Sequence, residues 1–235
     1  MTFNIRRGEG MDRQYDLARS AAVITSMGVD VAAIQEVDRA WSARSAFDDQ
    51  PARLAALTGM RPCYGPNLTS AAGGEYGTLV LSRLPILECL NAPLPKADGR
   101  EQRGVLQVVV DAGVRLRVFN THLGLDRAER EAQVRALAAI VASAGPGARI
   151  LAGDMNTGPG TTAAGAELEP LRPLFTDAWV TVGVGPGYTI PPDAPRARID
   201  MIFVAPPVTA LAAQVVPTLV SDHLPVVVDV ELRAP

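Results

Sequence analysis

Carboxylate, amide and imidazole side chains recur in this sequence where apolar stretches end. Layered α/β folds hold reactive side chains at strand ends, because the sheet fixes the backbone while the side chains project into a mouth. Hard cations such as Mg²⁺ prefer oxygen ligands, whereas zinc prefers His and Cys, and two histidines with two isolated cysteines disfavour a dedicated zinc centre. The pattern predicts a metal-assisted site from Asn4, Gln35, Glu36, His122, Asp154, Asn156, Asp200, Asp222 and His223.

Each of these residues also has an ordinary structural explanation. Glu36 could be a solvated carboxylate, and Asp154 and Asp222 could belong to turns. Either histidine could be a hydrogen-bonded core residue. The recurrence of the pattern at several strand ends is what favours chemistry over these separate explanations.

Short segments spread along the chain resemble the endonuclease/exonuclease/phosphatase superfamily and follow that superfamily's order. The blocks Gln-Glu, Gly-Asp-x-Asn and Ser-Asp-His-x-Pro are highly specific in combination. The resemblance implies a four-layer αββα sandwich of two mostly antiparallel or mixed β-sheets flanked by helices. It also implies metal-dependent hydrolysis of phosphate esters at one edge of the paired sheets. The segments are 2–5, 34–37, 76–83, 120–123, 153–156, 198–200 and 221–225.

The same resemblance implies roles on the metal side of the site. Glu36 is expected to be the principal ligand of Mg²⁺ or Mn²⁺, with Asn4 and Asp222 beside it. Asp154 is expected to orient or deprotonate the attacking water, and Asn156 to donate to the phosphate or to neighbour the metal.

The resemblance also implies roles for both histidines. His223 is expected beside the scissile phosphate with Asp200 holding its ring, and His122 is expected to contact a phosphoryl oxygen. A carboxylate paired with an imidazole raises its basicity and fixes its tautomer, and acid–base help of this kind contributes about 10²–10⁴-fold to a rate.

Three further residues are candidates for substrate binding. Arg100 and Arg103 lie where relatives carry a phosphate-contacting arginine, although either could be an ordinary surface charge. Tyr76 could pack against substrate, support His122 or belong to the core.

Periodicity predicts the elements that must position these residues. The stretch 127–135 interleaves Glu129 and Glu131 with arginines, which predicts a solvated helix face. Hydrophobic spacing and Gly or Pro boundaries predict helices over 12–28, 51–59 and 127–144. Alternating or continuous apolar runs predict strands at 3–5, 31–35, 78–82, 86–91, 104–111, 114–121, 150–152, 199–205 and 226–232.

Composition limits the class of protein. The 235 residues, 48% of them hydrophobic, suffice for one globular domain over residues 1–235 and exclude a disordered chain or a membrane span. We expect a soluble, cytoplasmic monomer without a signal peptide, although an upstream start stays open. Cys63 and Cys89 are expected to be buried free thiols rather than a disulfide or zinc ligands.

The formal charge of −3 disfavours general electrostatic capture of nucleic acid. The complete catalytic set that the resemblance implies and the compact acidic chain favour, as the leading hypothesis, a phosphodiesterase or phosphatase that uses Mg²⁺ or Mn²⁺ on a small or lipid-like phosphoester. A DNA endonuclease or deoxyribonuclease of the same superfamily is the alternative, because local arginines can bind a phosphate backbone. The third hypothesis is a non-catalytic module that binds a phosphorylated ligand.

Overall fold

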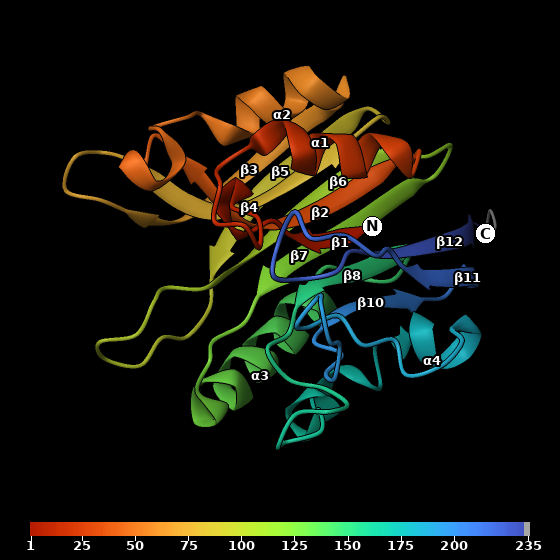
Figure 1. Ribbon diagram of the computed structural model, residues 1–235. Helices are drawn as coiled ribbons and strands as arrows, with labels where there is room; N and C mark the ends of the chain where they lie inside the picture. Colours follow the sequence, from red (N-terminus) through yellow and green to blue (C-terminus); the bar gives the residue numbers. More distant parts are fainter. Residues whose placement is uncertain (233–235) are drawn as a thin grey trace.

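Two six-stranded β-sheets lie face to face in the computed structural model of the protein, which describes residues 1–232 (Figure 1). Parallel pairs, β1 with β2 and β7 with β8, occur among antiparallel neighbours, so both sheets are mixed. In spatial order the first sheet contains β11 (Val208–Val215), β12 (Val226–Leu232), β1 (Thr2–Asn4), β2 (Val31–Arg39), β4 (Glu75–Ser82) and β3 (Arg61–Thr69). The second contains β5 (Ile86–Pro93), β6 (Gly104–Asp111), β7 (Arg115–His122), β8 (Arg149–Asp154), β10 (Asp200–Ala205) and β9 (Thr176–Asp177).

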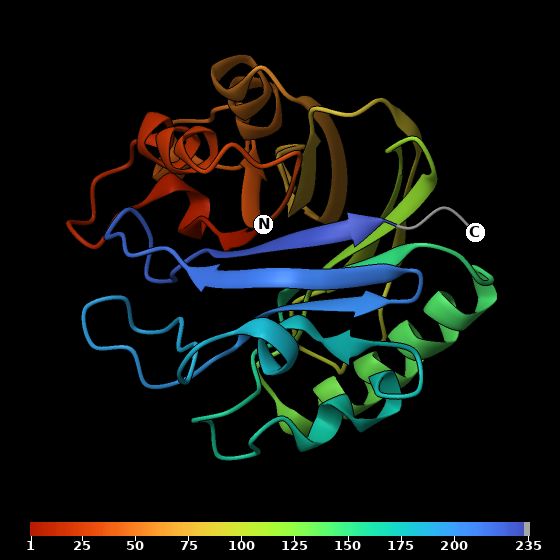
Figure 2. The same cartoon turned by 90° about the vertical axis from the view of Figure 1, so that its right-hand side faces the viewer.

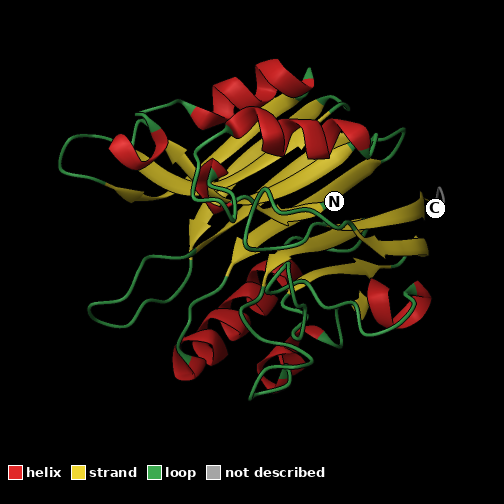
Figure 3. Cartoon of the chain, viewed as in Figure 1, coloured by secondary structure: helices red, strands yellow, loops and turns green. Residues whose placement is uncertain are grey.

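Helices cover both outer faces of this pair of sheets, which completes the predicted four-layer arrangement (Figure 3). Helices α1 and α2 lie over the first sheet, and α3 lies under the second (Figures 1 and 2). No helix within residues 1–232 is long and apolar enough to cross a membrane. The helices are α1 (Leu17–Ser26), α2 (Gln50–Thr58), α3 (Arg127–Ser143) and α4 (Ala178–Val182), with short 3₁₀ helices η1 (Arg6–Gly8), η2 (Ala43–Ser45) and η3 (Ala166–Leu171).

Alternating side chains explain why the central strands need cover on both faces. Ala33 of β2 packs between the sheets, whereas its neighbour Ile34 packs beneath α1 and α2. In β8, Ala152 joins the layer between the sheets and Leu151 joins the layer against α3. Strands that are buried on both faces have continuous apolar sequences. These strands could therefore be predicted from the sequence.

Several predicted boundaries change in the structure. The helix predicted at 12–28 begins only at Leu17, because the Asp16 side chain accepts a hydrogen bond from the Ala18 amide and caps the helix there. Strands β3 and β11 were not predicted. The strand predicted at 31–35 continues to Arg39 through a bulge.

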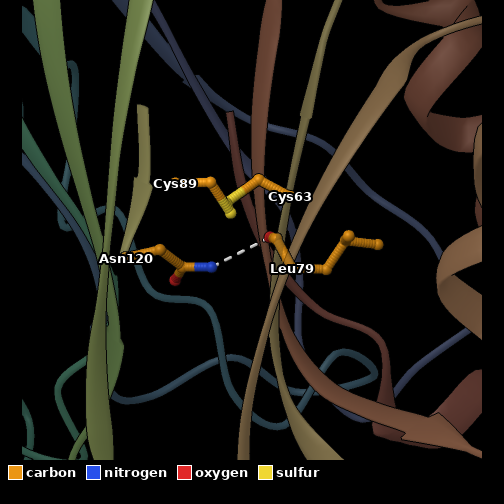
Figure 4. The surroundings of a disulfide bond; sticks show 4 residues. All are labelled: Cys63, Leu79, Cys89 and Asn120. Carbon is orange, nitrogen blue, oxygen red and sulfur yellow. Dashed lines mark hydrogen bonds between the residues drawn. A yellow bond between two sulfur atoms is a disulfide. The ribbon is translucent and has the colours of Figure 1, made fainter. Parts of the chain in front are cut away.

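The prediction of free thiols was wrong, because Cys63 of β3 and Cys89 of β5 form a disulfide (Figure 4). The two residues lie on edge strands of different sheets, and the sulfurs meet only because β3 and β5 stack at the same side of the sandwich. The bond therefore joins the two layers covalently at that side.

The prediction of a solvated face along 127–135 was wrong at its centre. Glu129 and Arg130 are buried, and the Arg130 guanidinium pairs with Glu167 of η3 at 2.7 Å. Arg127 and Glu131 do form an exposed pair, at 3.1 Å. The sequence pattern misled because the partner that permits burial of Arg130 comes from a distant segment.

Candidate active site

Three neighbouring strands of the second sheet bring His122, Asp154 and Asp200 side by side. Strands β7 and β8 are parallel, so their last residues, His122 and Asp154, are register partners. Strand β10 runs antiparallel to β8 and begins with Asp200 opposite Asp154. A fourth side chain, His223, reaches the group from the loop that precedes β12.

These four side chains form a buried group with short contacts. The Asp200 carboxylate lies 2.9 Å from His223 Nδ1. Oδ2 of Asp154 lies 3.4 Å from His122 Nε2 and 3.8 Å from His223 Nε2. Each of the four residues is no more than 6% exposed, so solvent screens their charges little.

His122 is held as a neutral imidazole by its surroundings. Burial, the Arg103 guanidinium and His223 lower its pKa well below the ordinary value. Arg103 Nη1 lies 3.0 Å from His122 Nδ1, and because a guanidinium can only donate, Nδ1 must accept. The ring proton is therefore on Nε2, where it faces Asp154.

His223 has the opposite electrostatic character. Burial opposes its charge, but the carboxylates of Asp200 and Asp154 outweigh that effect and raise the pKa of His223 to about 10. Burial also raises the pKa of Asp154, with the neighbouring Asp200 acting in the same direction. The surroundings therefore favour the neutral form of His122 and the cationic form of His223.

The first sheet contributes Asn4 at the end of β1 and Glu36 at a local distortion of β2. The pairing of β2 with β4 shifts register between Ile34 and Val37, and Glu36 within this bulge has a φ of 56°. Bulges re-aim a side chain out of the normal alternation. Asn4 Nδ2 donates to Glu36 Oε1 and to Asp154 Oδ2, both at 3.1 Å, and so connects the two sheets at the site.

Arginines approach the two remaining carboxylates on this side. Arg7 Nη1 lies 3.3 Å from Glu36 Oε2, and Arg6 Nε lies 3.4 Å from Asp222 Oδ2. The Asp222 side chain is 35% exposed, so it lies at the rim of the site rather than in its floor.

The donor set fits a divalent cation. The carboxylates of Glu36 and Asp222 supply hard oxygen atoms, and both cysteines are consumed by the disulfide. The Asn4 side-chain oxygen instead accepts a hydrogen bond from the Arg6 backbone amide at 3.0 Å, and its nitrogen faces the carboxylates. Ligand atoms of the buried group Asp154, Asp200 and His223 lie within 4.8 Å of one another. Within residues 1–232, Asp200 Oδ1 is buried without a hydrogen-bond partner, which marks unused acceptor capacity beside this group.

Buried amides support the site from behind. Gln35 Nε2 donates to Asn120 Oδ1 at 2.7 Å, and Asn120 Nδ2 donates to the carbonyl oxygens of Ile34 and Leu79 (Figure 4). The sequence placed Gln35 and Asn120 in motifs, but their contacts join the sheets rather than line the site.

A second support, missed by the sequence reasoning, holds the loops that follow β7 and β8. Arg130 donates to the carbonyl oxygens of Gly124 and Leu125, just beyond His122. Its partner Glu167 accepts a hydrogen bond from Thr157, one residue after Asn156. No local sequence signal marks this network, since its members lie on three separate segments.

Asn156 lies next to Asp154 in a left-handed conformation, with φ 51°. Its backbone amide donates to Asp154 Oδ1 at 2.9 Å, and its side-chain Nδ2 donates to the Leu123 carbonyl at 2.8 Å. The second contact uses one of the two side-chain N–H groups and holds Asn156 against the loop that follows β7.

The three candidate substrate-binding residues differ in position. Arg103 is buried against His122, and its Nη1 also pairs with Glu101 at 2.6 Å. Tyr76 is buried beneath the Arg44 guanidinium, which lies 5.3 Å from its ring centroid, and burial raises the pKa of its hydroxyl well above the ordinary value. Arg100 is exposed on a turn and pairs with Asp126 at 3.7 Å, without a contact to the group around Asp154.

Known proteins resemble this chain along its whole length. "Uncharacterized protein YbhP" of Escherichia coli is 31% identical, with 99% of this chain and 95% of that protein covered. The mannosyl-6-phosphatase Bt3783 of Bacteroides thetaiotaomicron superposes with a TM-score of 0.80 at 18% identity, with 98% of both chains covered. D. rerio TDP2, solved in complex with a single strand DNA product, gives 0.73 at 21% identity, with 98% of this chain and 97% of that chain covered.

Residues 1–223 match the Endonuclease/Exonuclease/phosphatase family. The order of the motifs, the paired mixed sheets and the buried histidine–carboxylate group agree with that match. The chain therefore belongs to the endonuclease/exonuclease/phosphatase family, whose members hydrolyse phosphate esters.

Proposed function

We propose that the protein is a Mg²⁺- or Mn²⁺-dependent phosphodiesterase or phosphatase that acts on a small or lipid-like phosphoester by in-line attack of water. The observation that carries this proposal is the convergence of both histidines with Asp154 and Asp200 at the end of the second sheet, next to Asn4 and Glu36 from the first. When bound, a divalent cation would neutralise phosphate charge and make phosphorus more electrophilic.

The residues of this chain divide the remaining work. Glu36 and Asp222 would hold the cation through carboxylate oxygen atoms, and Asn4, which was expected beside them, would hold Glu36 and Asp154 in place through its side-chain nitrogen. Asp154 would orient the attacking water and accept its proton, and its hydrogen bonds from Asn4 and from the Asn156 amide fix the carboxylate for that task.

The two imidazoles would have different roles toward the phosphoryl group. His223, cationic because of Asp200, would stabilise the negative charge that grows on the phosphoryl group or protonate the leaving oxygen. His122, with its proton on Nε2, would donate a hydrogen bond to a phosphoryl oxygen. Arg103 fixes that tautomer and would act through His122.

The size and charge of the chain support a small substrate. Its formal charge is −3, and Arg100, one of the two arginines expected to contact phosphate, points to a surface pair with Asp126. The superposition with the phosphatase Bt3783 supports monoester hydrolysis on this fold.

The activity can be tested with p-nitrophenyl phosphate and bis(p-nitrophenyl) phosphate in the presence of Mn²⁺ or Mg²⁺. We expect release of p-nitrophenol that stops with EDTA and returns with excess metal. The variant His223→Ala should be inactive although circular dichroism shows that it is folded at the assay temperature. Turnover that persists in EDTA or in this variant would contradict the mechanism, and binding without turnover would support the phospho-ligand module.

A DNA nuclease is the second candidate, favoured by the superposition with TDP2 in complex with a single strand DNA product. Such an enzyme should nick plasmid DNA at low concentration, and its binding to DNA should weaken steeply as salt rises. Cleavage of DNA in preference to the small esters would replace the leading proposal.

A further inference from the structure

Two consecutive arginines lie on the metal side of the site in an uncommon backbone conformation. Arg6 and Arg7, directly after β1, have φ values of 46° and 58°, a region that residues other than glycine rarely enter. The turn is held by backbone bonds within the loop and by Gln50, whose side chain donates to the Arg7 carbonyl at 2.6 Å. The fold therefore fixes the backbone positions from which the two arginine side chains extend.

Each guanidinium lies between two carboxylates. Arg7 contacts Glu36 at 3.3 Å and Glu9 at 3.7 Å, while Arg6 contacts Asp222 at 3.4 Å and Glu9 at 3.4 Å. Glu9 thus joins the two arginines, and Glu36 and Asp222 are the carboxylates that we assign to the cation. Arg7 Nε is buried without a hydrogen-bond partner among the described residues, so this guanidinium has unused donor capacity.

We propose that Arg6 and Arg7 are anion-binding residues that pair with Asp222 and Glu36 in the metal-free protein and bind the substrate phosphate once a divalent cation takes those carboxylates. This inference rests on the proposed function and specifies its substrate as a phosphomonoester dianion.

Electrostatics supports the exchange. A cation bound at Glu36 competes directly with the Arg7 guanidinium for the same carboxylate and repels it. Glu9 is outside the assigned ligand set, so it retains both arginines at the edge of the site after the exchange. Their N–H groups are then free for phosphate oxygens, which a planar guanidinium binds in a bidentate way.

The number of positive groups favours a doubly charged ligand. Arg6 and Arg7 would add two positive charges to those of the cation around the phosphate. A phosphomonoester carries two negative charges near neutral pH, whereas a diester carries one. Removal of an arginine should therefore weaken the binding of a dianion more than the binding of a monoanion.

Isothermal titration calorimetry on the whole chain tests the exchange. Mg²⁺ is titrated into metal-free wild type, Arg6→Gln, Arg7→Gln and Arg13→Gln; the last is an exposed arginine of the same loop. Loss of the competing charge should tighten Mg²⁺ binding by about 2- to 5-fold in the Arg6 and Arg7 variants, and the control should match wild type. Unchanged or weaker Mg²⁺ binding by Arg7→Gln would overturn the exchange.

The anion-binding half is tested by titration of phenylphosphonate, a dianion, and benzenesulfonate, a monoanion of similar shape, into the Mg²⁺-loaded proteins. Phenylphosphonate should bind about 10-fold more weakly to Arg7→Gln, with a smaller change for benzenesulfonate. Equal losses for both ligands would remove the preference for a dianion, and no loss would remove the anion-binding role.

Two further variants keep the test decisive. If Arg7→Gln unfolds, Arg7→Lys retains the charge but loses the planar fork, so phenylphosphonate binding should weaken while Mg²⁺ binding stays as in wild type. Glu9→Gln should weaken phenylphosphonate binding because it releases both arginines. None of these measurements needs turnover, so an inactive protein with the predicted binding would contradict the proposed function alone.

Discussion

The two sheets contribute unlike halves to the site. The half on β7, β8 and β10 consists of buried side chains in direct contact, such as His223 and Asp200 at 2.9 Å. The half on β1, β2 and the loop before β12 consists of partly exposed carboxylates, such as Asp222, paired with arginines at 3.3–3.4 Å. Under our two proposals, the buried half would carry out the chemistry, and the arginine-paired half would exchange partners when a cation and a substrate bind.

The largest effect should follow substitution in the buried half. Asp154→Asn retains the shape of the side chain but removes its ability to accept a proton, so kcat/KM should fall by about 10³-fold. Steady-state kinetics at saturating Mn²⁺ measures this, with Glu131→Gln on the exposed face of α3 as the control. A loss under tenfold would show that water is activated elsewhere.

Loss of the buried Arg130–Glu167 pair, which holds the loops behind the buried half, should strongly destabilise the protein. Arg130→Gln leaves Glu167 buried without its partner, which should lower the free energy of unfolding by about 3–5 kcal/mol. Arg127→Gln, which breaks the exposed pair with Glu131 on the same helix, should change it by less than about 1 kcal/mol. Urea denaturation measures the free energy of unfolding of both variants. Equal losses would contradict the expectation that the buried pair stabilises the protein more than the exposed pair.

The charge on His223 should depend on Asp200. In the folded metal-free protein its pKa is raised to about 10, so the stability it contributes is complete below pH 6.5 and is lost as the pH rises toward 10. In Asp200→Asn, most of this fall in folding stability between pH 6.5 and 10 should disappear. The same substitution should reduce kcat by about 10- to 100-fold. Unfolding in EDTA between pH 6 and 10 tests the sign, and NMR titration of His223 gives its pKa directly.

The smallest effect on stability should come from the exposed half. Asp222→Asn should leave the free energy of unfolding within about 0.5 kcal/mol of wild type, because the side chain is partly solvated. Its affinity for Mg²⁺ should fall by about tenfold. A strong destabilisation would show that Asp222 contributes as much to folding as the side chains of the buried half.

Sequence reasoning succeeded where the chemistry and the apolar runs coincide. Residues such as Glu36, Asp154 and His223 lie at the ends of strongly apolar or motif-bearing segments, so the fold could be predicted, and the structure brings these candidate side chains to one end of the sandwich. The register that sets His122 and Asp200 on either side of Asp154 is a property of the sheet and became visible only in the structure.

The failures have physical reasons. Strand β3 contains Pro62, Gly65 and Pro66, residues that disfavour a strand except at a sheet edge, which is where β3 lies. The burial of Arg130 and the Cys63–Cys89 bond both depend on partners from distant segments. The expected cytoplasmic location stays a prediction, and the disulfide weighs against it because the cytosol keeps most thiols reduced.

The disulfide also makes the two sides of the sandwich mechanically unequal. A cross-link that closes a loop with a sequence separation of 26 contributes about 3.5 kcal/mol in the chain-entropy account. The β3–β5 side then acts as a hinge, and any separation of the layers must start at the opposite side, where β11 and β9 form the edges. Oxidised protein should therefore exchange amide hydrogens first along β11, and reduction should make the two edges open more alike.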